Sequence, residues 1–105
     1  MENYRLAEKA LKVGVENIIV LHHNIVSSNF HSDHKRMEKY YNLALDCADS
    51  IIENGISINI PEVSIVEALE DFEALPVRNY PKAEAYAIVQ AMFNEFISLL
   101  AEAKN

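Results

Sequence analysis

The stretch LHHNIVSSNFHSDHKRMEKYYNLALDCADSIIENG, residues 21–55, decides the fold of this chain. Its second part repeats apolar residues at three- and four-residue steps, which is the period of one helix face. Ser32 is placed to cap the start of a helix, and Asp33 follows in the first turn, where an anion is favoured. Because Gly55 stands where a left-handed residue commonly ends a helix, we predict a long helix over residues 32–54. Its apolar face comprises Met37, Tyr41, Ala44, Leu45, Ala48, Ile51 and Ile52.

Two further long helices are predicted, one on either side of this stretch. Toward the N-terminus, the helical spacing of apolar residues continues through residues 3–26, and a polar break follows. Toward the C-terminus, Pro81 suits the start of a helix over residues 81–104. The segment before it includes a short helix, because Ser64 and Glu67 have the spacing of a capping box. The apolar face of the first helix includes Leu11, Val15, Ile18, His22 and Val26. The apolar face of the last helix includes Tyr86, Val89, Phe93, Phe96 and Leu100.

The composition suits one all-α domain spanning residues 1–105. Half of the 105 residues are apolar, and only two glycines and three prolines interrupt them, which favours long regular elements. Three long helices and one short helix would form a small bundle, and so short a chain buries a limited fraction of its surface. We therefore expect a second copy to cover the remaining apolar surface, giving a homodimer or a larger even-numbered homo-oligomer.

Charge and cysteine content argue against several classes of protein. The formal net charge is −7 without a basic tail, which argues against direct DNA binding, because affinity for DNA comes largely from neutralised phosphates. An acidic surface instead attracts cations. Cys47 is the only cysteine, which excludes an internal disulfide and favours a cytoplasmic location. No apolar run is long enough to cross a bilayer, and charged residues break up the start, so neither a membrane span nor a signal peptide is expected.

A cluster of histidines and carboxylates is the candidate site. Four histidines lie within thirteen residues, and nitrogen and oxygen donors together suit Fe, Mn or Zn. His22 lies on the apolar face of the first helix, and His34 lies one turn into the second helix, with Glu38 one turn later. If these helices form an antiparallel hairpin, the three side chains share one end of it. The full cluster is His22, His23, His31 and His34, followed by Glu38, Asp46, Asp49 and Glu53.

Asp49 and Glu53 are one turn apart and form a second pair of candidate ligands. Asp49 follows His34 by fifteen positions, which is roughly 22 Å along a straight helix. One chain therefore cannot bring all four ligands to one metal ion. If the second helix packs antiparallel against its copy, the histidine end of one chain meets the carboxylate end of the other. Symmetry then gives two equivalent sites.

This pattern resembles the signature of the Dps mini-ferritins, a family within the ferritin-like superfamily. That signature has a histidine on the first helix, a second twelve residues on, an aspartate fifteen further and a glutamate four beyond. His22, His34, Asp49 and Glu53 match this spacing without a gap, and Glu38 matches an acidic position one turn after the second histidine. The aromatic positions of the pattern are matched by Phe30, Tyr40 and Tyr41.

The resemblance implies a ferritin-like helical bundle with a ferroxidase centre at a two-fold interface, where histidines of one subunit face carboxylates of the other. Such a centre oxidises Fe(II) with peroxide or dioxygen. The resemblance implies no catalytic residue beyond the metal ligands His22, His34, Glu38, Asp49 and Glu53, and no organic cofactor. In that centre Glu53 would bridge metal ions, and Asp49 would bind metal or orient a ligand.

The chain also departs from the family pattern. His23 stands where the family has Trp, Ser27 stands where it has Gly, and the sequence ends where the fourth long helix would begin. The resemblance is therefore to a short variant and does not extend to the hollow shell. Two alternatives stay open: a non-catalytic helical oligomerisation module on the same scaffold, or a structural zinc ion held by His22, His34 and Glu38.

Overall fold

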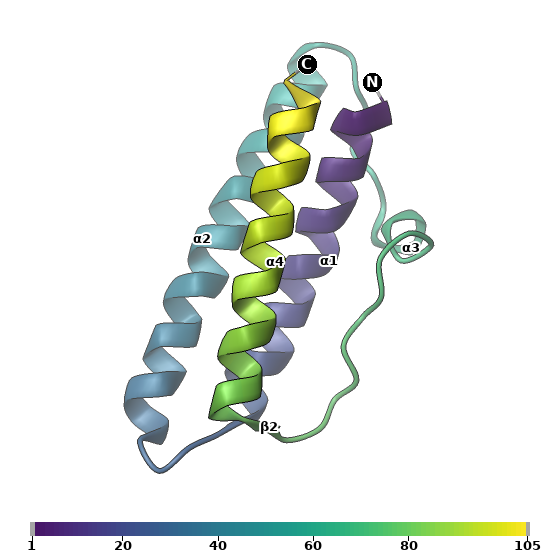
Figure 1. The fold of residues 1–105 in the computed structure, drawn as a ribbon. Coiled ribbons are helices and arrows are strands. Elements are labelled where there is room, and N and C mark those ends of the chain that lie inside the picture. Colours follow the sequence, from purple (N-terminus) through teal and green to yellow (C-terminus); the bar gives the residue numbers. More distant parts are fainter. Residues whose placement is uncertain (1, 105) are drawn as a thin grey trace.

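The computed structural model describes residues 2–104 and shows three long helices lying side by side (Figure 1). The elements are α1 (Glu2–Asn24), β1 (Ile25–Val26), α2 (Phe30–Ser57), α3 (Ile65–Ala68), β2 (Tyr80–Pro81) and α4 (Lys82–Ala103). α1 runs down the bundle in Figure 1, whereas α2 and α4 both run up it. The predicted all-α class, with three long helices and one short helix, is confirmed.

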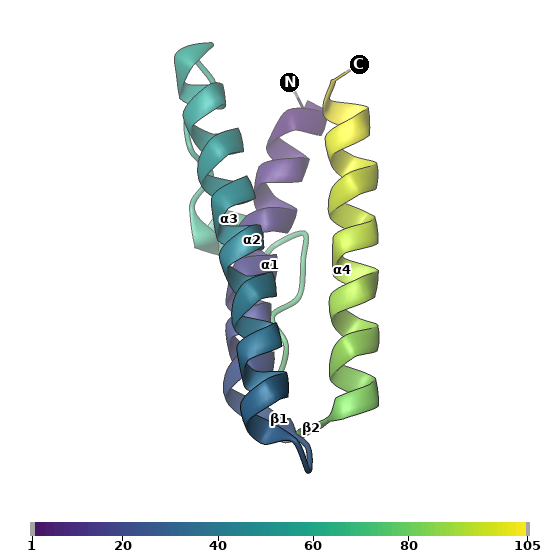
Figure 2. The same cartoon turned by 90° about the vertical axis from the view of Figure 1, so that its left-hand side faces the viewer.

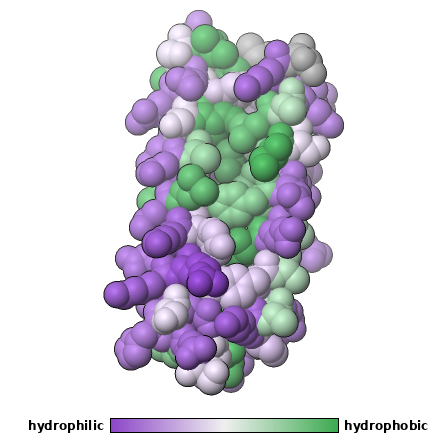
Figure 3. Space-filling model, turned by 60° about the vertical axis from the view of Figure 1, so that its left-hand side comes forward, coloured by the Kyte–Doolittle hydropathy of each residue, from purple (hydrophilic) through white to green (hydrophobic). Residues whose placement is uncertain are grey.

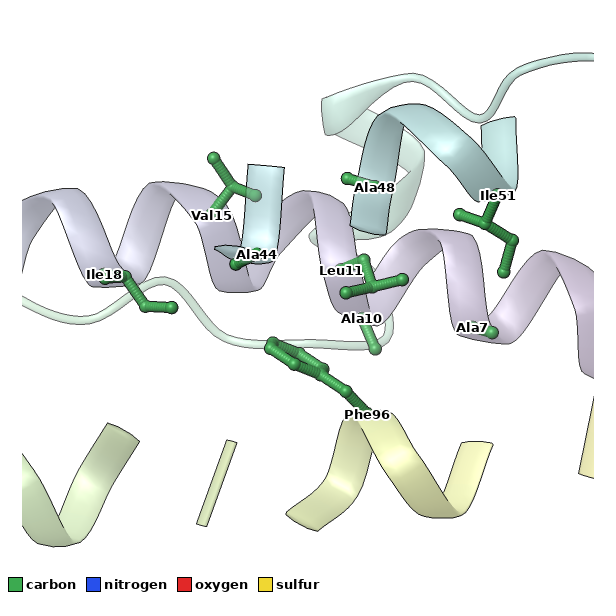
Figure 4. Close-up of a cluster of buried hydrophobic side chains, with 9 residues drawn as sticks. All are labelled: Ala7, Ala10, Leu11, Val15, Ile18, Ala44, Ala48, Ile51 and Phe96. Carbon is green, nitrogen blue, oxygen red and sulfur yellow. The ribbon is translucent and has the colours of Figure 1, made fainter. Parts of the chain in front are cut away.

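α1 is the central helix of the bundle. It packs along both α2 and α4, whereas α2 and α4 hardly contact each other. Figure 2 shows α4 standing apart from α2 along most of its length. Small residues of α2 allow that helix to approach α1 closely, and Phe96 fills the wider space toward α4 (Figure 4). The buried cluster comprises Ala7, Ala10, Leu11, Val15, Ile18, Ala44, Ala48, Ile51 and Phe96.

Two short parallel strands tie the start of α4 to the turn between α1 and α2. Ile25 pairs with Tyr80 and Val26 pairs with Pro81. The Tyr80 side chain is fully buried, and its hydroxyl donates to the carbonyl of Pro76 at 2.6 Å. This end of the bundle is therefore fixed by backbone pairing as well as by helix packing.

Asp33 anchors α2 to α4, which corrects the expected start of α2. Its carboxylate is buried and accepts hydrogen bonds from the Ser27 hydroxyl and, at 2.6 Å, from the Tyr86 hydroxyl. These two hydrogen bonds lower the pKa of Asp33. The prediction that Asp33 lies in the first turn of the helix is confirmed, but the prediction that Ser32 caps it is wrong. α2 already begins at Phe30, with Asn29 at the N-cap position, so Ser32 lies inside the helix.

Gly55 lies inside α2. The prediction that it ends the helix in a left-handed conformation is therefore wrong. The helix continues to Ser57, and the residue with a positive φ, 67°, is Asn59. A Cβ atom on Gly55 would lie 2.9 Å from Cε1 of Tyr4 and 3.2 Å from a carboxylate oxygen of Glu8. The glycine is therefore needed for the close approach of α1 and α2, not for a turn.

The connector between α2 and α4 crosses the outer side of α1. As predicted, the Ser64 hydroxyl caps α3 by accepting the N–H of Glu67 at 3.1 Å. Arg5 forms an ion pair with Glu67 at 2.8 Å, and Lys9 forms one with Asp71 at 2.7 Å. Such partly exposed pairs contribute little stability each, but they fix the course of the connector along α1.

Glu8 is a buried carboxylate between α1, α2 and the connector. Only 1% of its surface is exposed, and one oxygen accepts the Val63 N–H at 3.4 Å. Among residues 2–104 the other oxygen has no hydrogen-bond partner. Burial raises the pKa of Glu8, because the apolar surroundings penalise the charged form.

We expect Glu8→Gln to weaken the pH dependence of folding stability. The folded state holds the Glu8 proton more tightly than the unfolded state, so stability falls as pH rises from below the ordinary glutamate pKa through the raised one. Glutamine does not titrate and removes this fall. Urea unfolding between pH 4 and pH 7 measures it, with exposed Glu70→Gln as the matched control. Equal slopes for wild type and Glu8→Gln would contradict the prediction.

Candidate metal centre

His22 and His34 lie against each other where α1 passes into α2. Their ring centroids are 3.9 Å apart, and both side chains are half-buried. His22 belongs to the last turn of α1 and His34 to the second turn of α2. The antiparallel hairpin therefore brings these two histidines together, as the sequence predicts.

A hydrogen bond fixes the ring of His34. Its Nδ1 lies 3.0 Å from the carbonyl oxygen of His22. A carbonyl oxygen can only accept, so Nδ1–H donates and Nε2 of the neutral ring keeps its lone pair. A histidine that donates one ring N–H to a backbone carbonyl and presents the other nitrogen is the usual arrangement of a metal ligand.

The His22 ring has a nitrogen that the chain does not satisfy. Its Nδ1 is buried, and no hydrogen-bond partner for it exists among residues 2–104. Burial lowers the pKa of His22, and the neighbouring His34 and His23 rings lower it further, whereas Glu38 opposes them. The lowered pKa favours the neutral ring, which is the form that binds metal ions. An unsatisfied buried nitrogen calls for an explanation, and a bound metal ion would provide one.

A small pocket adjoins the histidine pair. It has a volume of about 240 Å³, and its lining residues are Ile19, His22, His23, Glu38, Tyr41 and Asn42. His22 and Glu38 therefore line one pocket, whereas His34, which was expected to share this site with them, is not among its lining residues. His23 also lines this pocket, although it is not among the metal ligands that the resemblance implies. His31, by contrast, is exposed and lies edge-on to Phe30.

Asp49 and Glu53 are exposed on α2 and lie far from the histidine pair. α2 is unbroken over its whole length, so the separation of roughly 22 Å between His34 and Asp49 stands. Within residues 2–104, no three His, Cys, Asp or Glu side chains gather closely enough to hold a metal ion. The described part of one chain therefore forms no three-ligand metal site by itself.

The candidate ligands of α2 nevertheless lie on one side of the helix. At 3.6 residues per turn, His34, Glu38, Asp49 and Glu53 fall within an arc of about 100°. Half-buried apolar residues occupy the same side between them. We name this the His–carboxylate face of α2; it comprises His34, Glu38, Tyr41, Leu45, Asp49, Ile52 and Glu53.

Comparison with known proteins found no match for this chain. No family model matches the chain, and neither a curated protein nor a solved structure matches it significantly. None of the helices described over residues 2–104 combines the length and the apolar character that a membrane crossing requires.

Proposed function

We propose that two copies of this chain pair through the His–carboxylate face of α2 and together bind and oxidise Fe(II), in the manner of a short Dps-like ferritin. The observation that carries the proposal is the His22–His34 pair, with its unsatisfied ring nitrogen at one end of the face. The carboxylates Asp49 and Glu53 stand at the other end.

The positions along α2 suit a two-fold axis. A pair of antiparallel helices related by an axis between residues 43 and 44 sets His34 opposite the partner's Glu53. The same axis sets Glu38 opposite the partner's Asp49, because both pairs are centred on the same point of the sequence. Each imidazole pair then faces a carboxylate pair, and the two sites are equivalent.

The charges on the exposed side of α2 support the same antiparallel pairing. Lys35 and Lys39 lie in its N-terminal half, and Asp46, Asp49 and Glu53 lie in its C-terminal half, all of them exposed. Head-to-tail packing brings the basic half of one helix beside the acidic half of the other. Parallel packing would set Lys35 and Lys39 against their own copies, so these two charges favour the antiparallel orientation, in which Glu38 and the partner's Asp49 are the like charges that face each other.

The residues fit Fe(II) as a substrate. Imidazole nitrogens from His22 and His34, with carboxylate oxygens from the partner's Asp49 and Glu53, suit iron in both oxidation states. Two ferrous ions each lose one electron to one hydrogen peroxide molecule, which takes up two protons and leaves as two water molecules. With dioxygen as oxidant, the same two electrons and two protons yield hydrogen peroxide.

An anaerobic titration with Fe(II), followed by peroxide, tests this function. Wild-type protein is expected to bind Fe(II) at stoichiometric concentrations and then to develop ferric absorbance rapidly. We expect His34→Ala and Glu53→Ala each to lower the oxidation rate at least about 10-fold, because each removes a ligand. Exposed His31→Ala and Glu70→Ala are the matched controls and should behave as wild type.

Two other results would each overturn the proposal. Stable dimers that take up no Fe(II) would make the chain an oligomerisation module. Tight zinc binding at His22, His34 and Glu38 without iron oxidation would make the centre a structural zinc site.

A further inference from the structure

An apolar groove runs between α2 and α4, on the opposite side of α2 from the His–carboxylate face. It contains two hollows with volumes of about 640 Å³ and 330 Å³. Figure 3 shows the upper part of this surface as a continuous apolar strip. Leu43, Cys47 and Ile51 line one wall, and Val89, Phe93 and Leu100 line the other. The groove exists because α2 and α4 both pack on α1 but hardly on each other.

The outward face of α4 is unusually free of charge for an exposed helix. Between Glu84 and Glu102 the helix has one charged residue, Glu95, and this side chain lines a different pocket. Ile97, at the centre of this stretch, is 66% exposed. Small side chains let a second helix approach closely. The exposed positions of this face are Ala83, Ala87, Gln90, Ala91, Asn94, Ile97 and Ala101.

We propose that a second copy of this chain fills the groove with its own α4. The partner's α4 lies antiparallel in the groove, and α4 of this chain lies in the partner's groove, so the contact is isologous. Among the long helices described here, α4 is the one with an uncharged outward face, whereas α2 exposes Lys39, Asp46 and other charges. The groove and the helix that suits it therefore lie on the same molecule.

Charge complementarity fixes the direction of the inserted helix. α2 and α4 run the same way, so the negative C-terminal dipole ends of both helices point toward the upper end of the groove. An antiparallel helix places its positive N-terminal dipole end there. Its negative C-terminal dipole end then lies toward Arg36 and Lys39 at the lower end. A parallel insertion would instead bring like ends of the helix dipoles together at both ends of the groove.

This contact is independent of the proposed iron site, because it uses the other side of α2. With the α2 pairing and the groove contact together, four chains form the smallest closed assembly. Ile97→Glu and Leu43→Lys place a charge in the groove contact and are expected to reduce this assembly to pairs, half its mass. The remaining pairs should still oxidise Fe(II). Leu45→Glu instead disrupts the His–carboxylate face, and its remaining pairs should lose Fe(II) oxidation. Val77→Glu is the control at an exposed apolar residue outside the groove.

Cys47 provides a second measurement, because this half-buried thiol lines the groove and is the only one in the chain. Alkylation should be slow in the assembled protein and severalfold faster in Ile97→Glu and Leu43→Lys, with helical circular dichroism unchanged. The proposal is overturned if wild type, Ile97→Glu and Leu43→Lys share one mass and one alkylation rate. It is also overturned if a different protein, rather than a second copy, is needed to protect Cys47.

Discussion

An equal mixture of His34→Ala and Glu53→Ala proteins, each expected to be at least about 10-fold slower than wild type alone, should recover about one quarter of wild-type Fe(II) oxidation. After random re-pairing half of the molecules are mixed dimers. In a mixed dimer, one site combines the intact histidine of one chain with the intact glutamate of the other. The second site carries both substitutions and is inactive. Initial rates of ferric absorbance, after joint refolding of the two proteins, measure the recovery.

The reciprocal mixture separates a shared site from a site within one chain. Wild type mixed equally with the double variant His34→Ala/Glu53→Ala should retain about one quarter of the activity if the site is shared, because every mixed dimer is inactive at both sites. A site within one chain would retain about half. It would also give no recovery when the two single variants are mixed, and that pair of results would reject the intersubunit centre.

The sequence predicts the histidine end of the candidate site because local rules determine it. Helical periodicity and a short break produce an antiparallel hairpin, and a hairpin brings His22 near His34. The unbroken helix likewise keeps Asp49 distant from His34. The unsatisfied Nδ1 of His22 and the role of His23 in the pocket were not predictable, because they depend on side-chain rotamers and on burial by α2.

Two errors in the predicted α2 boundaries have one cause. Ser32 and Gly55 match the local preferences for helix ends, but contacts between helices outweigh those preferences. Asp33 bonds to Tyr86, which is 53 positions away, and Gly55 admits the side chain of Tyr4, which is 51 positions away. Rules that read a few neighbouring residues do not detect such distant partners. The open groove between α2 and α4 escaped prediction for the same reason, although the expectation of uncovered apolar surface agrees with it.

The second large effect is expected in the core, where Phe96→Ala should destabilise the protein by about 3–5 kcal/mol. Phe96 is 4% exposed and is the one α4 residue among the buried members of the main cluster (Figure 4). Because α4 hardly contacts α2, this ring is a main contact of α4 with α1, besides Ala85 and Val89 in the cluster with Leu21. Urea unfolding at fixed protein concentration measures the cost, and exposed Ser98→Ala should change stability by less than about 0.5 kcal/mol. Equal effects of the two substitutions would contradict the role given to Phe96.

The partner of Phe96 is a glycine, and this explains why Gly14 is tolerated inside α1. A Cβ atom on Gly14 would lie 2.2 Å from Cζ of Phe96, so the ring packs directly on the helix backbone. Alanine would gain about 1 kcal/mol in helix propensity, but overpacking against a rigid ring costs about 1–3 kcal/mol. Gly14→Ala should therefore destabilise the wild type and stabilise Phe96→Ala, where the ring is gone. A double-mutant cycle in urea measures this reversal of sign, and additive effects would show that the ring does not exclude a side chain from position 14.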